Sequence, residues 1–169
     1  MATMATGGDR EHFVGVLRRF DTAMLVTHDH EGGLRSRPMA LADIEDDGTT
    51  WFVTAAHTAK TDELQPHAAV NVAFQSGMSF ASLTGDAELL KDDAKARKLW
   101  QEPWRVWFPD GPEESDLVLI RIQPSVGEYW DQRGAKGLRY VWEAAKAYAR
   151  GERLGDNDDS PRGHGKVDL

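Results

Sequence analysis

The chain has 169 residues, enough for one domain with a sizeable hydrophobic core. It contains no cysteine, which excludes disulfides, cysteine metal ligands and thiol catalysis, and is compatible with the cytoplasm. Its net charge of -8 argues against general nucleic-acid binding, because phosphate backbones attract clustered positive charge. No apolar run is long enough to span a membrane, and the first ten residues lack the features of a signal peptide, so no membrane association is expected.

The predicted elements, in chain order, describe a mainly β domain with flanking helices. Apolar residues at helical spacing predict a first helix from Asp9 to about Phe20. Later helices are expected over residues 56–67, 92–101 and 138–150. Alternating or β-branched segments predict strands over residues 23–27, 34–44, 50–55, 68–75, 78–90 and 116–123, the last able to continue to 130. Six strands with short turns favour a closed antiparallel barrel, filled by its own side chains, with any ligand outside it.

The domain organisation follows from where these patterns stop. We expect a single domain over residues 9–151. Residues 1–8 are small, and residues 152–169 are charged, glycine-rich and without apolar periodicity, so both ends are predicted to be flexible. The segment 102–115 is predicted to be irregular. Its neighbourhood is rich in tryptophan, which is typical of a binding surface, although the sequence does not say what residues 100–108 contact.

Basic and hydroxyl residues gather within residues 34–64. If residues 35–44 pair antiparallel with residues 50–55 through the turn at Gly48, the two far ends meet in space. An arginine fork, a lysine charge and hydroxyls at a helix start have the chemistry of a phosphate-binding site. The residues brought together would be Arg35, Arg37, Thr54, Thr58 and Lys60.

Each of these features also has an ordinary structural explanation. Pro38 cannot donate a ladder hydrogen bond, so its strand should have an edge, a bulge or a ligand at that point. The alternative for Arg37 is a surface ion pair with an acid. For Lys60 it is a solvated side chain beside an ordinary helix cap. The histidines are dispersed and show no zinc spacing, so no metal site is predicted.

The same segments resemble the pyridoxamine 5'-phosphate oxidase-like family, in particular its general stress protein branch. The motifs that carry the resemblance are RSRPMAL, WFVT, TAKTDEL, VNVAF and ASLTGDAE, in that order between residues 35 and 88. No single motif is diagnostic, but their order and spacing are fairly specific, and the resemblance spans residues 13–132. It implies an FMN-binding split β-barrel.

The resemblance also implies positions for the cofactor. Arg37, with Arg35 as a weaker candidate, would bind the FMN phosphate, and the Thr58–Lys60 element would close over it. The strand after Arg37 and the end of the WFVT strand would present backbone to the flavin ring, and Trp130 would approach the flavin across a dimer interface. The implied binding residues are Arg35, Arg37, Pro38, Met39, Ala40, Val53, Thr54, Thr58, Ala59, Lys60 and Trp130.

The function implied is that of an FMN-dependent oxidoreductase with the flavin at a homodimer interface and NADH or NADPH as a natural electron donor. No catalytic side chain can be named. Oxidation of pyridoxamine phosphate itself is not expected, because the tail around His164 lacks the surroundings of the family's substrate motif. Two alternatives stay open: a non-catalytic flavin-binding stress protein that senses or stores FMN, and a split barrel that binds haem or a deazaflavin. A haem would need His28, His57 or His67 as its axial ligand.

Overall fold

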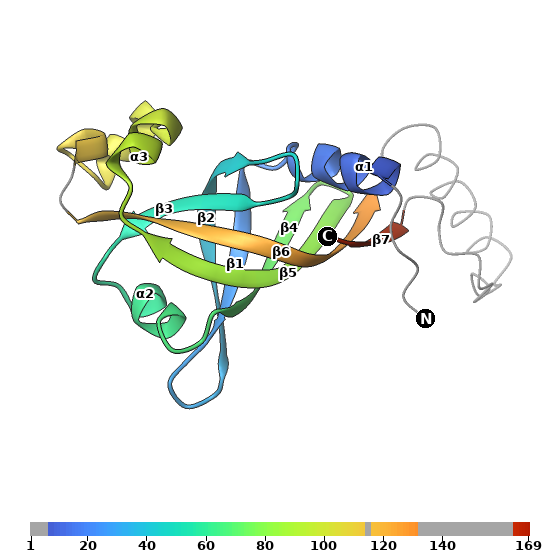
Figure 1. Cartoon of the computed structure of the whole chain (residues 1–169), viewed down its shortest axis with the longest axis horizontal. Coiled ribbons are helices and arrows are strands. Elements are labelled where there is room, and N and C mark those ends of the chain that lie inside the picture. The colour runs from blue at the N-terminus through green and yellow to red at the C-terminus, as the bar shows by residue number, and fades with distance from the viewer. Residues whose placement is uncertain (1–6, 114–115, 132–163) are drawn as a thin grey trace, which may run out of the picture.

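The computed structural model describes residues 7–113, 116–131 and 164–169. Its strands form a single β-barrel, and its helices lie at the periphery of this barrel (Figure 1). The elements are α1 (Gly7–Leu17), β1 (Thr22–His28), β2 (Leu34–Ile44), β3 (Thr50–Ala55), α2 (Ala59–Leu64), β4 (Ala69–Ser76), β5 (Ser79–Leu90), α3 (Asp93–Leu99), the short 3-10 turns η1 (Glu102–Val106) and η2 (Gly111–Glu113), β6 (Leu117–Asp131) and β7 (His164–Asp168).

Six strands close into the barrel. Their order is β3-β2-β1-β4-β5-β6, every pairing is antiparallel, and a further pairing of β3 with β6 joins the two ends. The predicted six-stranded antiparallel barrel is therefore confirmed. The pairing of β5 with β6 contains one irregularity, a shift of register between Thr84 and Gly85.

The long strand β2 is shared unequally between its two neighbours. It pairs with β1 from Leu34 to Ala40, but with β3 only from Leu41 to Ile44. The antiparallel pairing expected between residues 35–44 and 50–55 is therefore present, but only over the part of β2 next to the turn, from Leu41 to Ile44. A closed barrel staggers its strands, so neighbours overlap over only part of their length. The first half of β2 consequently has one edge without a strand partner among the described residues, and Pro38 lies in it, as its missing N–H predicts.

The core has two parts. The larger fills the barrel and is closed by α1, whose Phe13 and Leu17 are fully buried together with Phe52, Leu83 and Ile120. The smaller lies on the outer side of β3 and β6, where α3 and η1 cover the sheet. Its members are Trp51, Ala96, Leu99, Trp104, Phe108, Leu117 and Leu119. Buried Trp104 thus anchors the otherwise irregular loop after α3 onto the barrel.

The chain end differs from the expectation. Residues 152–163 lie outside the described part, as do residues 1–6 and the helix predicted over 138–150. His164–Asp168, predicted to be a flexible tail, instead forms β7 and pairs with β6 from Val126 to Trp130. Val167 is only 1% exposed and joins the barrel core. A five-residue strand with one buried side chain shows no readable periodicity, and its partner lies far away in sequence, so the pattern could not reveal it.

The buried side chain of β7 gives a test of this strand. Replacing Val167 by Ala removes two methyl groups from the core, so we expect the free energy of unfolding to fall by roughly 1–3 kcal/mol. The control is Lys166→Ala, an exposed neighbour on the same strand, which should change stability by less than about 0.5 kcal/mol. Urea unfolding measures the free energy of unfolding of both variants, and we expect its dependence on urea concentration to be unchanged. Equal stability of the two variants would show that β7 does not pack on the barrel.

Candidate functional site

A cavity of about 430 Å³ opens where the free edge of the first half of β2 faces the end of β3. This volume lies within the range of roughly 300–1,000 Å³ found for small-molecule sites. One wall comes from β2 and β3, another from the start of α2, and a third from η1 and the residue pair that follows it. The lining residues are Pro38, Met39, Ala40, Val53, Thr54, Ala55, Thr58, Lys60, Trp104, Trp107 and Phe108.

The sequence-predicted residues divide into two groups. Seven of them line this cavity: Pro38, Met39, Ala40, Val53, Thr54, Thr58 and Lys60. Four others, Arg35, Arg37, Ala59 and Trp130, are not among its lining residues. The aromatic wall formed by Trp104, Trp107 and Phe108 was not predicted by residue, and the tryptophan-rich composition of that loop was the one signal that pointed to it.

Lys60 brings the positive charge to the cavity. Its side chain is partly buried, and burial, followed by the positive charge of Arg37, lowers the pKa of its ammonium group, while Glu63 opposes the shift. Within the described part of the chain this ammonium makes no hydrogen bond or ion pair. A partly desolvated ammonium without a partner has unused capacity to hold an anion.

Arg37 is committed to a buried network behind Lys60. Its Nη2 lies 2.7 Å from Oε2 of Glu63, and its Nη1 donates to Oγ1 of Thr27 at 2.8 Å. Thr27 donates in turn to Glu63 at 2.6 Å, and the Glu63 side chain is only 3% exposed. Burial opposes ionisation of Glu63, but the hydrogen bonds from Thr27 and Arg37 outweigh it and lower its pKa. Arg37 is therefore paired with an acid, as its alternative explanation supposed, although that acid is buried rather than at the surface.

Two further candidates lie elsewhere. The Arg35 side chain is 62% exposed and forms an ion pair with Asp29 in the β1–β2 turn, at 3.2 Å. Trp130 pairs with Phe80 in the β5–β6 ladder and stacks on His164 of β7, with ring centroids 5.0 Å apart. Within this single chain, neither residue takes part in the cavity.

The aromatic wall is buried at its base and open at its rim. Trp104 and Phe108 are 6% and 8% exposed, whereas Trp107 is 68% exposed and Val106 is 79% exposed. Large exposed apolar side chains beside a cavity are typical of ligand or protein contacts. The rim is thus suited to cover a bound molecule or to meet a partner.

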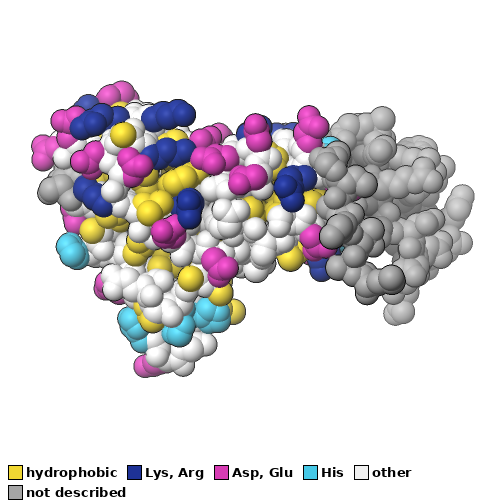
Figure 2. Space-filling model, in the orientation of Figure 1, with side chains coloured by type: hydrophobic (Ala, Val, Ile, Leu, Met, Phe, Trp, Pro, Cys, Tyr) yellow, Lys and Arg dark blue, Asp and Glu magenta, His cyan; other side chains and the backbone are white. Residues whose placement is uncertain are grey.

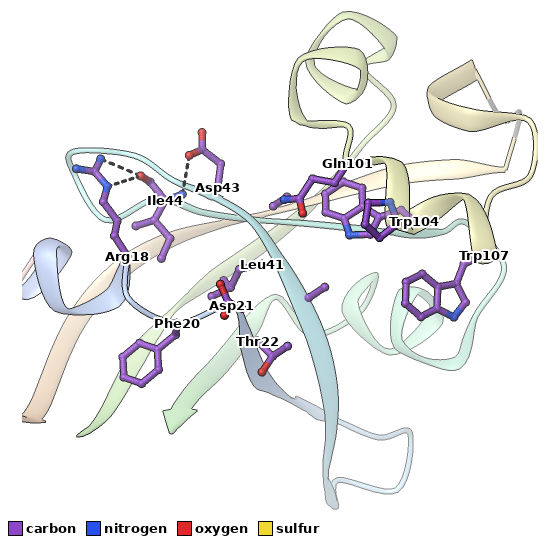
Figure 3. Close-up of a pocket in the computed structure, with 13 residues that line it drawn as sticks. Arg18, Phe20, Asp21, Thr22, Leu41, Asp43, Ile44, Gln101, Trp104 and Trp107 are labelled. Carbon is purple, nitrogen blue, oxygen red and sulfur yellow. Dashed lines mark hydrogen bonds between the residues drawn. The ribbon is translucent and has the colours of Figure 1, made fainter. Parts of the chain in front are cut away.

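A second cavity, of about 470 Å³, lies on the other side of this wall and shares Ala40, Trp104 and Trp107 with the first. Figure 3 shows the side chains of Asp21 and Thr22 on one side of this hollow and those of Gln101 and the two tryptophans on the other. The remaining lining residues are Arg18, Phe20, Leu41, Ala42, Asp43, Ile44 and Pro103.

The chemistry of the first cavity favours a flat aromatic molecule with an anionic group. Apolar strand edges and indole rings suit a planar ring, and Lys60 with Thr58 suits the anion. Lys60 is the one titratable side chain in its lining. No group of three potential metal-ligating side chains occurs among the described residues, and none of His28, His57 and His67 lines the cavity. Figure 2 shows a group of histidines at the end of the molecule that carries the β1–β2 turn and α2, whereas His12 lies on α1 and His164 on β7.

No helix in the described part of the chain has the length and apolar character needed to cross a membrane.

Comparisons with known proteins agree with this fold. The model of the family described as "Pyridoxamine 5'-phosphate oxidase like" matches residues 8–155. The curated protein bli-3 of Neurospora crassa is 31% identical over 119 residues, which cover 63% of this chain and 57% of bli-3. The chain therefore spans little more than half the length of this relative.

Solved structures share the architecture. A Jannaschia protein named after general stress protein 26 superposes with a TM-score of 0.67 at 24% identity, over 97% of this chain and all of that one. A pyridoxamine 5'-phosphate oxidase-related, FMN binding protein from Nostoc punctiforme gives 0.52 at 18% identity, over 76% of this chain and 83% of that one. At these identities the likeness concerns the fold. With a family model matching most of its length and a barrel of this architecture, the chain belongs to the pyridoxamine 5'-phosphate oxidase-like family.

Proposed function

We propose that this protein binds FMN in the cavity between β2, β3, α2 and η1 and acts as a flavin-dependent oxidoreductase. The observation that carries the proposal is the unpaired Lys60 ammonium at one end of a slot lined by apolar strand edges and indole rings. A planar ring with a phosphate on a flexible arm has the matching shape and charge. The FMN-binding protein from Nostoc punctiforme, which has the same fold, supports this choice of ligand.

Each wall has a role in holding such a ligand. Lys60 and the Thr58 hydroxyl would hold the phosphate. The edge of β2 around Pro38 offers backbone groups to the ring, because no strand of the described residues pairs with that edge. Trp104 and Phe108 would shield the ring from water. FMN, when bound, supplies the redox chemistry, which agrees with a lining that contains no acid and no base other than Lys60.

Arg37 has a supporting role in this proposal. Its guanidinium is held by Glu63, yet its charge is close enough to lower the pKa of Lys60. It therefore adds positive potential at the phosphate end without needing to touch the ligand. Glu63 in turn fixes where that charge lies.

A homodimer completes the proposal. Residues that face outward form continuous rows across the sheet, and one row runs from Pro38 through Met24, Ala73 and Ser82 to Glu128. Met24 is 38% exposed, and so is Phe80 in the next row, beside Trp130. If a two-fold axis crosses such a row of residues, each end of the row meets the opposite end of the partner's row. This arrangement would bring the Trp130 end of one subunit toward the Pro38 edge of the other cavity.

The alternative function is binding of FMN without turnover, for sensing or storage. This alternative is favoured by the absence of any titratable side chain other than Lys60 from the cavity lining, because no other group there could move a substrate proton. A deazaflavin would present a similar flat ring, and a binding competition between it and FMN would show which of the two the protein prefers. A haem has weaker support, since no histidine lines the cavity.

The first prediction is that purified protein binds FMN and quenches its fluorescence on titration. Lys60→Met should weaken binding by roughly ten- to a hundredfold, since a charge-assisted contact is worth about 1.5–3 kcal/mol. Lys98→Met is the matched control, because Lys98 is exposed on α3 and does not line the cavity, and it should leave the affinity unchanged. Equal affinities of the two variants would reject the cavity as the FMN site.

Anaerobic addition of NADH or NADPH to the FMN complex separates the two functions. We expect the visible flavin absorption to bleach as the bound flavin is reduced. A flavin that stays oxidised with both donors, while it remains bound, would favour the non-catalytic alternative. No binding of FMN, with binding of a deazaflavin or haem, would replace the cofactor assignment.

A second prediction concerns the Arg37–Glu63 pair. Arg37→Ala leaves a buried carboxylate without its ion-pair partner, so we expect the free energy of unfolding at neutral pH to fall by roughly 3 kcal/mol. Arg35→Ala, which breaks an exposed pair, should cost less than about 1 kcal/mol. Glu63→Gln added to Arg37→Ala should restore part of the loss, because it removes the unpaired charge.

The pH dependence of this effect has a definite sign. The folded-state pKa of Glu63 lies below its ordinary value, so its stabilising contribution is present above that ordinary value and is lost as pH falls through the folded pKa. In Arg37→Ala burial raises the pKa, and protonation relieves the cost. The difference in the free energy of unfolding between wild type and Arg37→Ala should therefore become smaller as the pH is lowered from roughly 7 to roughly 4. A gap that is constant with pH would contradict the role given to Glu63.

A third prediction tests the dimer. Sedimentation should give twice the 18.8 kDa chain mass for the wild type. Met24→Lys places a charge in the middle of the sheet face and should shift the protein to monomer. Val106→Lys is a matched apolar-to-lysine change on η1, away from that face, and should remain dimeric. If Val106→Lys produced monomers and Met24→Lys did not, the dimer interface would have to lie at η1 instead of on the sheet face.

A further inference from the structure

We propose that the second cavity binds the reactant that exchanges electrons at the first, and that it selects a small planar molecule that is neutral or cationic and rich in hydrogen-bond donors. The role as reactant site rests on the proposed function. The binding preference does not, because it follows from the residues of the second cavity alone.

The position of the second cavity argues for a reactant. It meets the first at Ala40, Trp104 and Trp107, which line both. A molecule in the second cavity therefore lies against the same strand edge and the same indole wall as a ligand in the first. Two cavities of about 430 and 470 Å³ with three lining residues in common are suited to two molecules side by side.

The polar groups of the second cavity include two carboxylates that can only accept hydrogen bonds, and a hydroxyl and a carboxamide that can accept as well as donate. The carboxylate of Asp21, the hydroxyl of Thr22 and the carboxamide of Gln101 make no side-chain hydrogen bond within the described residues. Asp43 accepts one hydrogen bond, from the N–H of Ile44 at 2.9 Å, and keeps a second oxygen. These groups suit a ligand that donates hydrogen bonds.

The position of Asp21 is fixed by the backbone. Its carbonyl oxygen accepts a hydrogen bond from the N–H of Leu41 at 2.9 Å, which joins the start of β1 to β2. This contact lies at the register shift of β2 between Leu41 and Asp43. Irregular ladder positions of this kind often redirect side chains beside functional sites. Here the irregularity lies beside Asp43, which lines the same hollow as Asp21.

The positive group in the lining is already neutralised. Arg18 donates from Nε and Nη2 to the carbonyl oxygen of Ile44, and its Nη2 lies 2.7 Å from Asp46. With Arg18 paired to Asp46, the charges of Asp21 and Asp43 remain. An indole face also attracts cations.

The two cavities therefore have opposite electrostatic character. Lys60 makes the first favourable for a phosphate, whereas Asp21 and Asp43 make the second unfavourable for a phosphate or a carboxylate. A phosphate group placed inside the second cavity would meet repulsion from Asp21 and Asp43, whereas a neutral or cationic ring would not, including the nicotinamide ring of a donor whose phosphates stay outside. This specificity agrees with the expectation that pyridoxamine phosphate is not the substrate.

The test uses three probes of one shape and different charge: 1-methylnicotinamide, nicotinamide and nicotinate. Each is titrated into the full-length protein without FMN, and the indole N–H signals of Trp104 and Trp107 are followed by NMR, assigned with Trp107→Phe. We expect affinity to fall in the order cation, neutral, anion. Asp21→Asn with Asp43→Asn should weaken the cation roughly fivefold for each carboxylate, as expected for about 1 kcal/mol of screened attraction.

Asp86→Asn is the control, because it removes the same charge from an exposed position on β5 that lines neither cavity. Equal binding of the three probes, no binding of any, or an unchanged ranking in the double variant would overturn the assignment. These outcomes leave FMN binding untouched. Failure of FMN to bind, with the cation preference intact, would reject the proposed function and keep the second site as a cation site only.

Discussion

Closure of the barrel by the β3–β6 pairing is the constraint on which the rest of the structure depends. The closed barrel staggers its strands, so β3 pairs along its whole length with β6 on one edge but only through Thr50, Trp51 and Phe52 with β2 on the other. The first half of β2 is then left with a free edge, and this edge forms one wall of the candidate cofactor cavity. The site is therefore a direct product of strand stagger rather than a separate addition to the fold.

Charge is distributed around this edge in an ordered way. Arg37 forms an ion pair with the buried Glu63, which also accepts a hydrogen bond from Thr27, whereas Lys60 makes no hydrogen bond or ion pair among the described residues. On the far side of the Trp104–Trp107 wall the sign reverses. An acidic chain thus presents one positive slot and one negative slot back to back, which allows two unlike molecules to lie close together without competing for one site.

Much of this could be predicted from local sequence. Alternating strands gave the barrel, and the unusual Pro38 indicated the free strand edge. The β2–β3 register could not be read locally, because closure sets it. For the same reason the sequence could not show that Arg37 is paired with an acid whereas Lys60 is not. The partner of Arg37 is Glu63, which lies 26 residues away in the chain. The wall formed by Trp104 and Trp107 depends on how a loop without periodicity packs on β3 and β6.

The seventh strand has a consequence for handling the protein. The second half of β6 extends beyond β3, so without β7 it would present bare backbone along one side. Such edges template aggregation, and β7 covers this one. The N–H of Leu169 also donates to the carbonyl oxygen of Ser125 at 2.9 Å, so the residue that follows β7 is tied to the barrel as well. Proteolytic removal of β7 would uncover the edge of β6 and reduce the solubility of the protein.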